Sequence, residues 1–537
     1  MILRGKAFAA GASRAERVPR ELPERSVCRG SVQGGRGEER GTSPFFRWDL
    51  RRDPYLFGSG KRDSMTEARE TEVGAGRGRR LASVSVSLDG VRAENLLRMG
   101  EGAPRGFWAR EGRWFAHVGE TARLEVSTAA GGQGRFRTIR DRAQALLFHS
   151  REEYPTGAKN PSPRLFGGFS FREDHEAAGP WESFPSACFI LPEWELACDG
   201  GAAVLTLRRL LPPEEEVGAF EEDLSSKLHE FGERLLGSSS GVPKGDPWIP
   251  ATRSDPDQET WTGAVERAVS AVAAGDLSKV VLARVQSVVS EGWLDPVEVV
   301  MNLWRENGGA HVFLFEPVPG HVLVGAAPET VATVTGGMFR ATAVAGSTGR
   351  GRSKEETEAL AKSLLRSRKD LVEHRICVED VVSHLHGLSE EVRAQDTPHI
   401  LALPTIQHLE TVVEARLRPG VTVLSALEAL HPTPAVCGLP RDRALEFLRK
   451  EERFHRGWYA GPVGWFDGEG DGVFVPALRS AVGKGREWHL FAGAGIVEGS
   501  DPDREWEETR IKLRTVLRAL SVARASGETP KRDRSDP

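Results

Sequence analysis

The sequence predicts an α+β protein whose sheets are mostly antiparallel. Stretches that alternate apolar and polar residues, as strands do, begin at Leu81–Val91 and continue through Gly112–Val126. Cys188–Leu210 holds further stretches of this kind, separated only by short turns. Helical periodicity is confined to separate segments, so strands and helices do not alternate strictly. Strand pairs joined by short turns favour an α+β architecture over a parallel α/β sheet.

The first half of the chain carries its remaining elements at wide spacing. Helical patterns cover Phe136–Arg151 and Glu214–Leu236, and Leu165–Phe171 reads as a further strand. Gly237–Asp257 is rich in Gly, Ser and Pro, which is typical of a surface linker. We therefore expect this segment to separate an N-terminal part of the fold from a C-terminal one.

The second half of the chain has a denser run of elements. The helix Trp261–Ala274 leads into the strand Lys279–Val289, and the helix Pro296–Glu306 leads into the strands VFLFEP and HVLVGAAPE. One long amphipathic helix is predicted over Lys354–His386, with Gly387 as its stop.

The pattern then returns to strands. A short helix is expected to open at Ser425, its N-cap, and to end by Leu430, because Pro432 lies just beyond. The strands YAGPVGWFD, GVFVPALRSAV and WHLFAGAGIV follow, and the helix Asp503–Ala525 closes the folded part.

The ends of the chain differ in composition from the rest. Residues 1–80 are rich in Arg, Gly, Ser and Glu with few periodic apolar positions, which predicts disorder. The acidic residues argue against a transit peptide, and we favour Met65 as the true start. The predicted parts are 1–80 as a disordered or spurious extension, 81–250 as the N-terminal part of the fold, 258–522 as its core, and 523–537 as a disordered tail.

Bulk composition excludes several classes of protein. The 72 basic and 77 acidic side chains give a net charge of −5, which argues against binding nucleic acid through a basic surface. The five cysteines have no CxxC spacing, so neither a disulfide framework nor a zinc site is expected. No apolar run is long enough to cross a bilayer. A cytoplasmic location without membrane contact is therefore expected.

Several charged residues stand in unusual surroundings. Lys279 opens the apolar run KVVLA, and Glu329 follows the strand HVLVGAAP directly. Loss of hydration at the start of a buried strand is expected to lower the pKa of Lys279. Glu373 and Glu508 lie in two separate predicted helices. On the residues alone, each of these side chains is more often an ordinary solvated one.

Five segments together change that balance. They are GDLSKVVLAR (Gly275–Arg284), GAAPE (Gly325–Glu329), KDLVEH (Lys369–His374), HPTPAVCGLP (His431–Pro440) and AGAGIVEGSDPDREWEETRIK (Ala492–Lys512). In combination they resemble the chorismate-utilising enzymes, and specifically the isochorismate synthases. The resemblance covers roughly residues 81–522 and is strongest in the second half of the chain. It implies a large two-sheet antiparallel β-sandwich with helices packed outside, and an active site between the layers.

The resemblance assigns catalytic roles to two residues. Lys279 matches the lysine that deprotonates the attacking water, whereas anthranilate and aminodeoxychorismate synthases usually carry Gln there. Glu329 matches the general acid that protonates the departing hydroxyl. Because that acid must keep its proton near neutral pH, we expect burial to raise the pKa of Glu329.

The resemblance also implies a magnesium site. Glu373 and Glu508 match the two carboxylates that hold Mg²⁺, a cation that prefers oxygen ligands. Asp370 and Glu505 each precede one of them by three residues and share its helix face, so we expect them to act through metal-bound water. The ion would hold the ring carboxylate of chorismate.

Other residues match positions that contact the substrate. Arg479 corresponds to the arginine that holds the enolpyruvyl carboxylate, for which its planar fork is suited. His408 also matches a histidine near the ring, but a satisfied core histidine is an equally good interpretation. The expected substrate contacts are Gly346, Ser347, Ala435, Val436, Tyr459, Arg479, Gly493 and Lys512, with Gly495 beside them.

The implied activity is the Mg²⁺-dependent, reversible conversion of chorismate to isochorismate, which feeds menaquinone, siderophore or salicylate biosynthesis. One alternative is a salicylate synthase, which also eliminates pyruvate and tends to carry Thr or Ser at the position of Ala435. An ammonia-using enzyme of the anthranilate synthase type and a non-catalytic chorismate-binding module remain further alternatives. No obligatory protein partner is expected. The residues leave the downstream pathway and the oligomeric state open.

Overall fold

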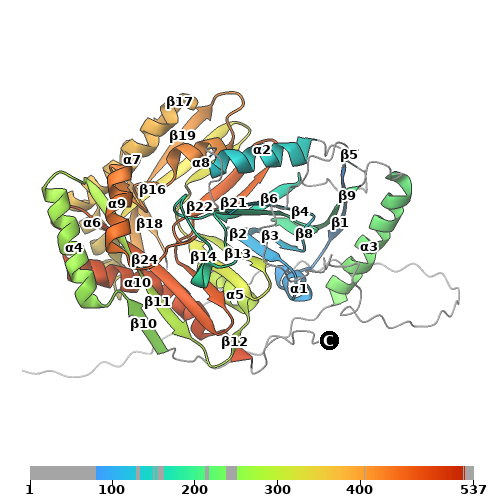
Figure 1. The fold of residues 1–537 in the computed structure, drawn as a ribbon, viewed down its shortest axis with the longest axis horizontal. Coiled ribbons are helices and arrows are strands. Elements are labelled where there is room, and N and C mark those ends of the chain that lie inside the picture. Colours follow the sequence, from blue (N-terminus) through green and yellow to red (C-terminus); the bar gives the residue numbers. More distant parts are fainter. Residues whose placement is uncertain are drawn as a thin grey trace, which may run out of the picture. The chain divides into compact units, whose positions relative to one another are not determined.

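The computed structural model describes residues 80–127, 134–148, 152–153, 162–211, 217–237, 251–403, 406–523 and 525–526. The predictions made for residues 1–79 and 527–537, including the start at Met65, lie outside the described residues. Among the described residues, most strands belong to two large sheets (Figure 1). These are called the larger and the smaller sheet below.

The larger sheet runs through β10 (Ala251–Asp255), β11 (Lys279–Val289), β24 (Glu487–Ile496), β23 (Ser480–Lys484), β14 (His321–Ala327), β13 (His311–Val318), β2 (Arg105–Arg110), β3 (Arg113–Val118), β8 (Trp194–Asp199), β9 (Ala203–Leu211), β1 (Arg80–Leu88) and β5 (Glu152–Glu153). A short strand, β20 (Gly438–Leu439), also pairs with β11. Neighbouring strands are antiparallel, with the exception of the β1–β5 pair.

The smaller sheet runs through β17 (Ser389–Ala394), β19 (Ile406–Leu417), β16 (Met338–Gly349), β15 (Ala332–Thr335), β22 (Gly472–Pro476), β21 (Pro462–Asp467), β6 (Arg164–Phe169), β7 (Ala187–Leu191) and β4 (Ala122–Val126), with β18 (His399–Ala402) paired to β19. A separate two-stranded ribbon joins β12 (Trp293–Leu294) to β25 (Ala525–Ser526). Both large sheets therefore draw strands from both halves of the chain.

The helices are α1 (Ala93–Met99), α2 (Arg135–Phe148), α3 (Val217–Gly237), α4 (Gln258–Ala273), α5 (Pro296–Glu306), α6 (Lys354–Leu364), α7 (Arg368–His386), α8 (Val423–Leu430), α9 (Arg441–Glu451) and α10 (Pro502–Ser521), with a 3₁₀ turn at Gly179–Trp181. None of the described helices is long and apolar enough to span a membrane.

The alternation of side chains along each strand produces the layers. In β13, Phe313 and Phe315 belong to an aromatic-rich cluster between the two sheets, together with Phe166 of the smaller sheet. Val312 and Leu314 point the opposite way, into a cluster that includes residues of α1, α3, α5 and α10. Successive side chains of a strand point to opposite faces, so one strand serves two cores.

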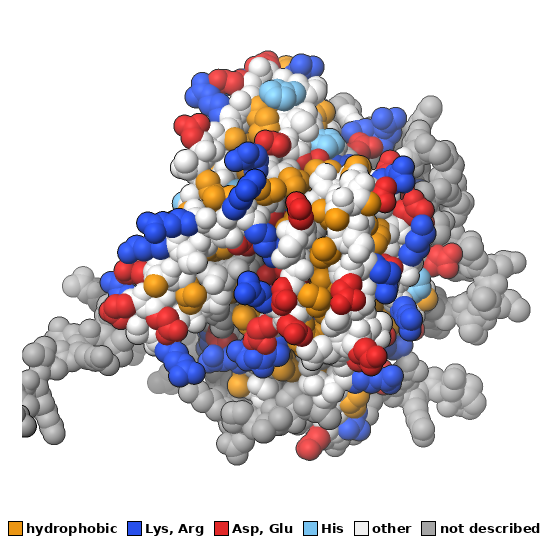
Figure 2. All heavy atoms as spheres, turned by 90° about the vertical axis from the view of Figure 1, so that its left-hand side faces the viewer, with side chains coloured by type: hydrophobic (Ala, Val, Ile, Leu, Met, Phe, Trp, Pro, Cys, Tyr) orange, Lys and Arg blue, Asp and Glu red, His pale blue; other side chains and the backbone are white. Residues whose placement is uncertain are grey.

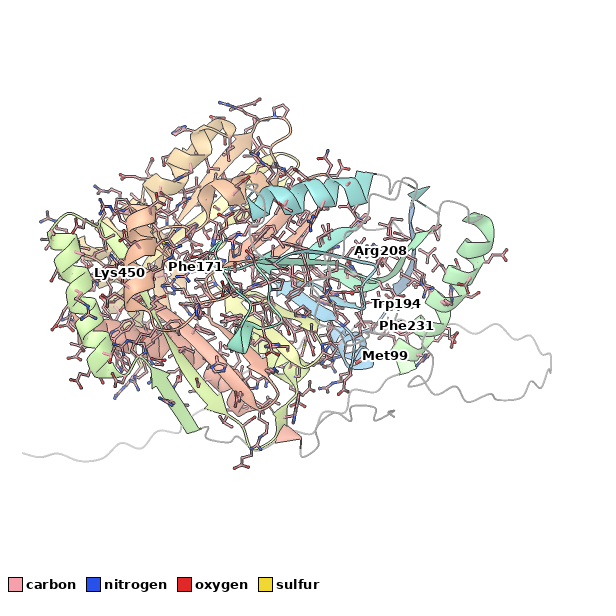
Figure 3. The ribbon with its side chains drawn as sticks, viewed as in Figure 1. Met99, Phe171, Trp194, Arg208, Phe231 and Lys450 are labelled. Atoms are coloured by element: carbon pink, nitrogen blue, oxygen red, sulfur yellow. The ribbon has the colours of Figure 1, made fainter. Side chains whose placement is uncertain are left out.

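The outer helices cover the two sheets on opposite sides. Trp194 of the larger sheet stacks on Phe231 of α3, with ring centroids 4.1 Å apart, and Figure 3 labels both rings. Helices α2, α7 and α8 contribute to the core on the outer side of the smaller sheet. The predicted α+β fold of two antiparallel sheets with helices outside is therefore confirmed (Figure 1).

The surface agrees with the near balance of charges in the sequence. Figure 2 shows the face that lies on the left of Figure 1, where α4 and α6 are found. Basic and acidic side chains are mixed on this face rather than separated into patches of one sign.

Several predicted boundaries are wrong. The helix expected over Lys354–His386 is two helices, because Ser367 acts as N-cap of α7 and accepts a hydrogen bond from the backbone N–H of Asp370. Part of the expected linker is strand β10, which pairs with β11. Helix α8 begins earlier than expected, because Thr422 rather than Ser425 is its N-cap. The other predicted helix ends shift by about one turn at most.

Candidate active site

The sheet order brings the predicted catalytic residues to one end of neighbouring strands. Lys279 is the first residue of β11, and Glu329 follows the end of β14. These strands are separated in the sheet by β24 and β23. Because neighbouring strands here are antiparallel, the start of β11 and the end of β14 lie at the same end of the sheet.

Lys279 is buried and held by two side chains of α7. Only 1% of its surface is exposed, and its Nζ lies 3.0 Å from Glu373 Oε1 and 3.4 Å from Cys377 Sγ. Burial disfavours the ammonium charge, but the contacts with Cys377 and Glu373 outweigh it, and the pKa of Lys279 is raised. The expectation of a lowered pKa is therefore wrong, because the sequence did not show that Glu373 lies against the amine.

Glu329 is buried, and no cationic side chain in the described part of the chain forms an ion pair with it. Burial raises its pKa to about 8, although the positive charges of Lys279, Arg479 and Lys512 oppose the shift. The direction is the one expected from the sequence. Lys279, Arg479 and Lys512 therefore lie close enough to Glu329 to affect its charge.

Thr330, the residue after Glu329, is held by two hydrogen bonds. The backbone N–H of Thr330 donates to Thr342 Oγ1 at 3.0 Å, and Thr330 Oγ1 lies 3.2 Å from Nε2 of His311. His311 in turn contacts Arg110 at 2.7 Å. This chain of contacts fixes the backbone next to Glu329.

The predicted metal carboxylates come from α7 and α10. On α10, Glu508 pairs with Lys512 at 2.6 Å, and Glu505 pairs with Lys369 of α7 at 2.7 Å. Burial and the neighbouring charge of Glu508 raise the pKa of Glu505 to about 7. Burial is the largest cause that raises the pKa of Asp370. The charges of Glu373 and Glu508 raise this pKa further, whereas the hydrogen bond from Ser367 lowers it. The carboxylates of Glu373 and Glu508 are therefore close enough to repel those of Asp370 and Glu505.

This donor set fits a hard divalent cation. Among the described residues, no three His, Cys, Asp or Glu side chains form a ready-made metal centre. Mg²⁺ commonly binds through one or two carboxylates and completes its coordination with water and substrate oxygens. Glu373 and Glu508 supply such oxygens, and buried carboxylates that repel one another gain from an added positive charge.

Arg479 lies in a turn rather than in the strand that the sequence predicts. The sequence placed it in an apolar strand, but it lies in the turn between β22 and β23, with a φ of 48°. Its Nη2 donates to Nε2 of His408 at 3.1 Å, and Nδ1 of His408 lies 2.9 Å from Ser347 Oγ. Burial and the charge of Arg479 hold the pKa of His408 well below its ordinary value, so the ring is neutral. Arg479 has no carboxylate in ion-pair contact within the described residues.

The glycines allow close packing where charged groups meet. A Cβ atom on Gly495 would lie 2.2 Å from Glu373 Oε1 and 3.0 Å from Lys279 Cε. Gly346 has a φ of 77° at a bulge of β16, and a Cβ there would lie 3.0 Å from Cβ of Asp370. Only glycine therefore fits at Gly495 without displacing Lys279 and Glu373.

The remaining predicted contacts lie around the same residues. Lys512 Nζ donates to the carbonyl of Gly493 at 2.8 Å, and a Cβ on Gly493 would lie 3.1 Å from the hydroxyl of Tyr459. Ala435 packs with Cys377 in a small cluster, and Val436 is buried. The structure thus brings together residues of both large sheets and of α7 and α10.

Some neighbours of the site were not predicted. Cys377 contacts the proposed base, and its only sequence signal is its position four residues after Glu373, on the same helix face. Thr330 and His311 contact each other beside Glu329. Arg456 and Glu452 hold the loop that carries Val436, and a buried arginine of this kind has no local signature.

The chain belongs to the chorismate-binding enzyme family, since the family described as "Chorismate binding enzyme" matches residues 68–521. It is 32% identical over 423 residues to the isochorismate synthase MenF of Bacillus subtilis, covering 78% of this chain and 88% of that protein. It is 34% identical to a salicylate biosynthesis isochorismate synthase of Pseudomonas aeruginosa, covering 74% and 82%.

Solved structures agree with this assignment. The menaquinone-specific isochorismate synthase MenF of Escherichia coli matches with a TM-score of 0.67 and 26% identity, covering 82% of this chain and 95% of that one. Anthranilate synthase component I of Streptococcus pneumoniae matches with a TM-score of 0.60 at 20% identity, covering 86% and 96%, which shows a shared fold.

Proposed function

We propose that the protein is an isochorismate synthase that converts chorismate reversibly to isochorismate. The observation that carries the proposal is the buried Lys279 on the same sheet end as the buried Glu329. A lysine at this position activates water rather than ammonia in the family that the sequence resembles. The activity of the relatives from Bacillus subtilis and Pseudomonas aeruginosa supports the same conclusion.

In the proposed reaction, one water enters and one leaves. Lys279, as a free amine, takes a proton from a water whose oxygen bonds to C2 of chorismate. The ring double bonds shift, the C4–O bond breaks, and Glu329 gives its proton to the departing hydroxyl. Because the pKa of Glu329 is about 8, its carboxyl group is mostly protonated at neutral pH and can act as the acid there. Substrate and product are isomers, so the reaction can run in both directions.

The carboxylates of the substrate would meet the buried cations of the site. Arg479 makes no ion pair within the described residues, so its charge is available to the enolpyruvyl carboxylate. We assign further contacts to the Lys512 amine, the Tyr459 hydroxyl and the Ser347 hydroxyl. The backbones of Gly346 and Gly493 and the side chains of Ala435 and Val436 complete the proposed substrate contacts.

We propose that Glu373 and Glu508 hold Mg²⁺, with Asp370 and Glu505 contacting its water ligands. When bound, the ion would neutralise these carboxylates and polarise the ring carboxylate of chorismate. Glu373 would then stabilise the charged form of Lys279 less strongly, which favours the free amine that the reaction needs. We further propose that the enzyme acts in the cytoplasm without an obligatory protein partner.

Incubation of the purified protein with chorismate, with Mg²⁺ or with a chelator, tests the proposal. We expect isochorismate to form only with the metal and to reach an equilibrium mixture from either side. Stoichiometric release of pyruvate would indicate a salicylate synthase instead. Formation of anthranilate from ammonia would contradict the role given to Lys279.

A further inference from the structure

We propose that Arg456 and Glu452 are positioning residues for the reaction. They fix the loop that carries Ala435 and Val436 against β11, the strand that begins at Lys279. The inference rests on the proposed function, because that function places the loop and the lysine on the same substrate.

Arg456 joins three parts of the chain. It is 5% exposed, and it donates to the carbonyl of Val436 at 2.8 Å and to the carbonyl of Val281 at 2.6 Å. Its Nε donates to Glu452 Oε2 at 2.7 Å, and its guanidinium lies 4.5 Å from the ring centre of Phe171. Glu452 is four residues from Arg456, but the other partners lie far from it in the sequence. The arginine therefore cross-links distant parts of the chain.

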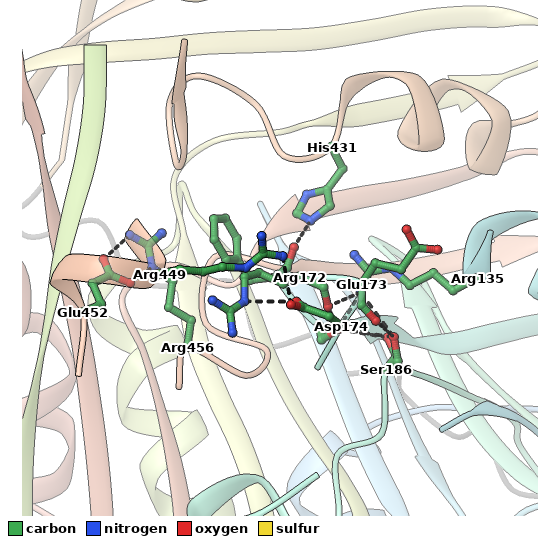
Figure 4. Close-up of polar contacts among 11 residues, drawn as sticks. Arg135, Arg172, Glu173, Asp174, Ser186, His431, Arg449, Glu452 and Arg456 are labelled. Carbon is green, nitrogen blue, oxygen red and sulfur yellow. Dashed lines mark hydrogen bonds and ion pairs between the residues drawn. The ribbon is translucent and has the colours of Figure 1, made fainter. Parts of the chain in front are cut away.

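Glu452 completes the cross-link on the strand side. It directly follows α9, and its Oε1 accepts from the backbone N–H of Ala283 at 2.9 Å and from Arg456 Nη2 at 2.5 Å. The pair is drawn in Figure 4. Two side chains therefore satisfy one donor and one acceptor of β11, at Ala283 and Val281.

The edge of β11 explains why side chains are needed there. Strand β20 pairs only with Lys279 and Val280, and β10 begins its pairing at Val285. Among the described residues, no strand pairs with Val281–Arg284 on that edge. Buried backbone groups without partners destabilise a fold. Arg456 and Glu452 fill this gap, and the same arginine holds the loop after α8.

The chain offers a matched control pair. Arg267 pairs with Glu451, the residue before Glu452, with its Nη2 2.6 Å from Glu451 Oε2, and Arg267 is exposed. In Arg456→Lys the positive charge stays but a single ammonium cannot serve all three acceptors in the same geometry. We expect kcat to fall by at least about tenfold with KM for chorismate changed less than about threefold, because misplacement costs turnover more than binding. Arg267→Lys should leave both unchanged.

Hydrogen exchange gives a second readout that needs no activity. We expect peptides covering 279–284 and 431–440 to exchange faster in Arg456→Lys and in Glu452→Gln, but not in Arg267→Lys. Unchanged exchange in these peptides, or a kcat within twofold of the wild type in both variants, would overturn the inference. If the wild type makes no isochorismate, the proposed function fails, and the exchange result still decides the positioning role. Should Arg456→Lys not fold, Glu452→Gln carries both measurements.

Discussion

Lys279 and Glu329 show how neighbours decide what burial does to a charge. Both side chains are almost fully buried. Burial raises the pKa of Glu329 to about 8, as it does for an acid without a close counter-charge. For Lys279 the same loss of water is outweighed by Cys377 and Glu373, which raise its pKa. Both groups therefore carry a proton at neutral pH in the free protein.

Removal of either group should stop the reaction without preventing binding. We expect Lys279→Ala and Glu329→Gln each to lower kcat by about 10²–10⁴-fold, the usual contribution of a positioned acid or base. Both variants should still bind chorismate, as measured by calorimetry. Lys450→Ala is the control, because Lys450 is exposed and, among the described residues, its ion-pair partner is Glu446 on its own helix. Wild-type rates in either variant would refute the assigned role.

The pH dependence follows from the acid. Glu329 must be protonated to act, and raising the pH through its pKa of about 8 removes that proton. We expect kcat/KM to be maintained below about pH 8 on this account and to fall about tenfold per pH unit above it. A pH–rate profile of the wild type measures this limb. An alkaline limb that begins near the ordinary pKa of a glutamate would contradict the assignment.

At the scale of elements, caps decide where the helices that carry the carboxylates begin. The sequence pattern of apolar residues runs on through Lys354–His386, which is why one helix was expected. The Ser367-Arg-Lys-Asp370 sequence is the overlooked signal, because a serine three residues before an acidic residue favours a new helix start. Helix α7 therefore starts separately from α6, and Asp370 and Glu373 lie in its first two turns.

The cap of α7 should therefore affect the metal requirement. We expect Ser367→Ala to destabilise the start of α7 by about 1 kcal/mol and to raise the Mg²⁺ concentration needed for half-maximal activity. Ser353→Ala is the matched control, since Ser353 caps α6 in the same way, accepting from Glu356 N at 3.2 Å. A Mg²⁺ titration of activity compares the two variants. Equal Mg²⁺ requirements in both would contradict the link.

At the scale of the molecule, an aromatic layer holds the two sheets together. Phe315 of the larger sheet stacks on Trp458 with centroids 5.5 Å apart, and its ring lies 5.6 Å from that of Phe166 in the smaller sheet. We expect Phe315→Ala to lower the free energy of unfolding by about 3–5 kcal/mol, through lost contacts and a cavity. Met338→Ala, at an exposed apolar side chain, should change it by less than about 0.5 kcal/mol. Thermal unfolding of both variants distinguishes them.

The fold class and the family could be predicted because they depend on local patterns. Alternation gave the strands, and five short motifs gave the family, which the comparison with known proteins confirms. The order of strands in the sheets could not be read from periodicity. Strand β10 was missed because a short edge strand follows a segment rich in Gly and Pro.

The motifs propose residues for the site but do not give their contacts. The motifs name Lys279 and Glu373, yet only the folded chain shows that Lys279 Nζ lies 3.0 Å from Glu373 Oε1. Arg479 was placed in a strand because its neighbours are apolar, whereas its positive φ puts it in a turn. Roles that depend on distant partners, such as that of Arg456, need the tertiary structure.

The two sheets each contribute one side of the proposed substrate contacts. Gly493 belongs to the larger sheet, and Gly346 and Ser347 belong to the smaller one. In the proposed binding mode, the distance between the two sheets is therefore also the distance across the bound ring. A substitution among the interleaved rings, far from any chorismate atom, can slow catalysis simply by letting the two halves drift apart. Sequence change in that layer is thus constrained by turnover as well as by folding.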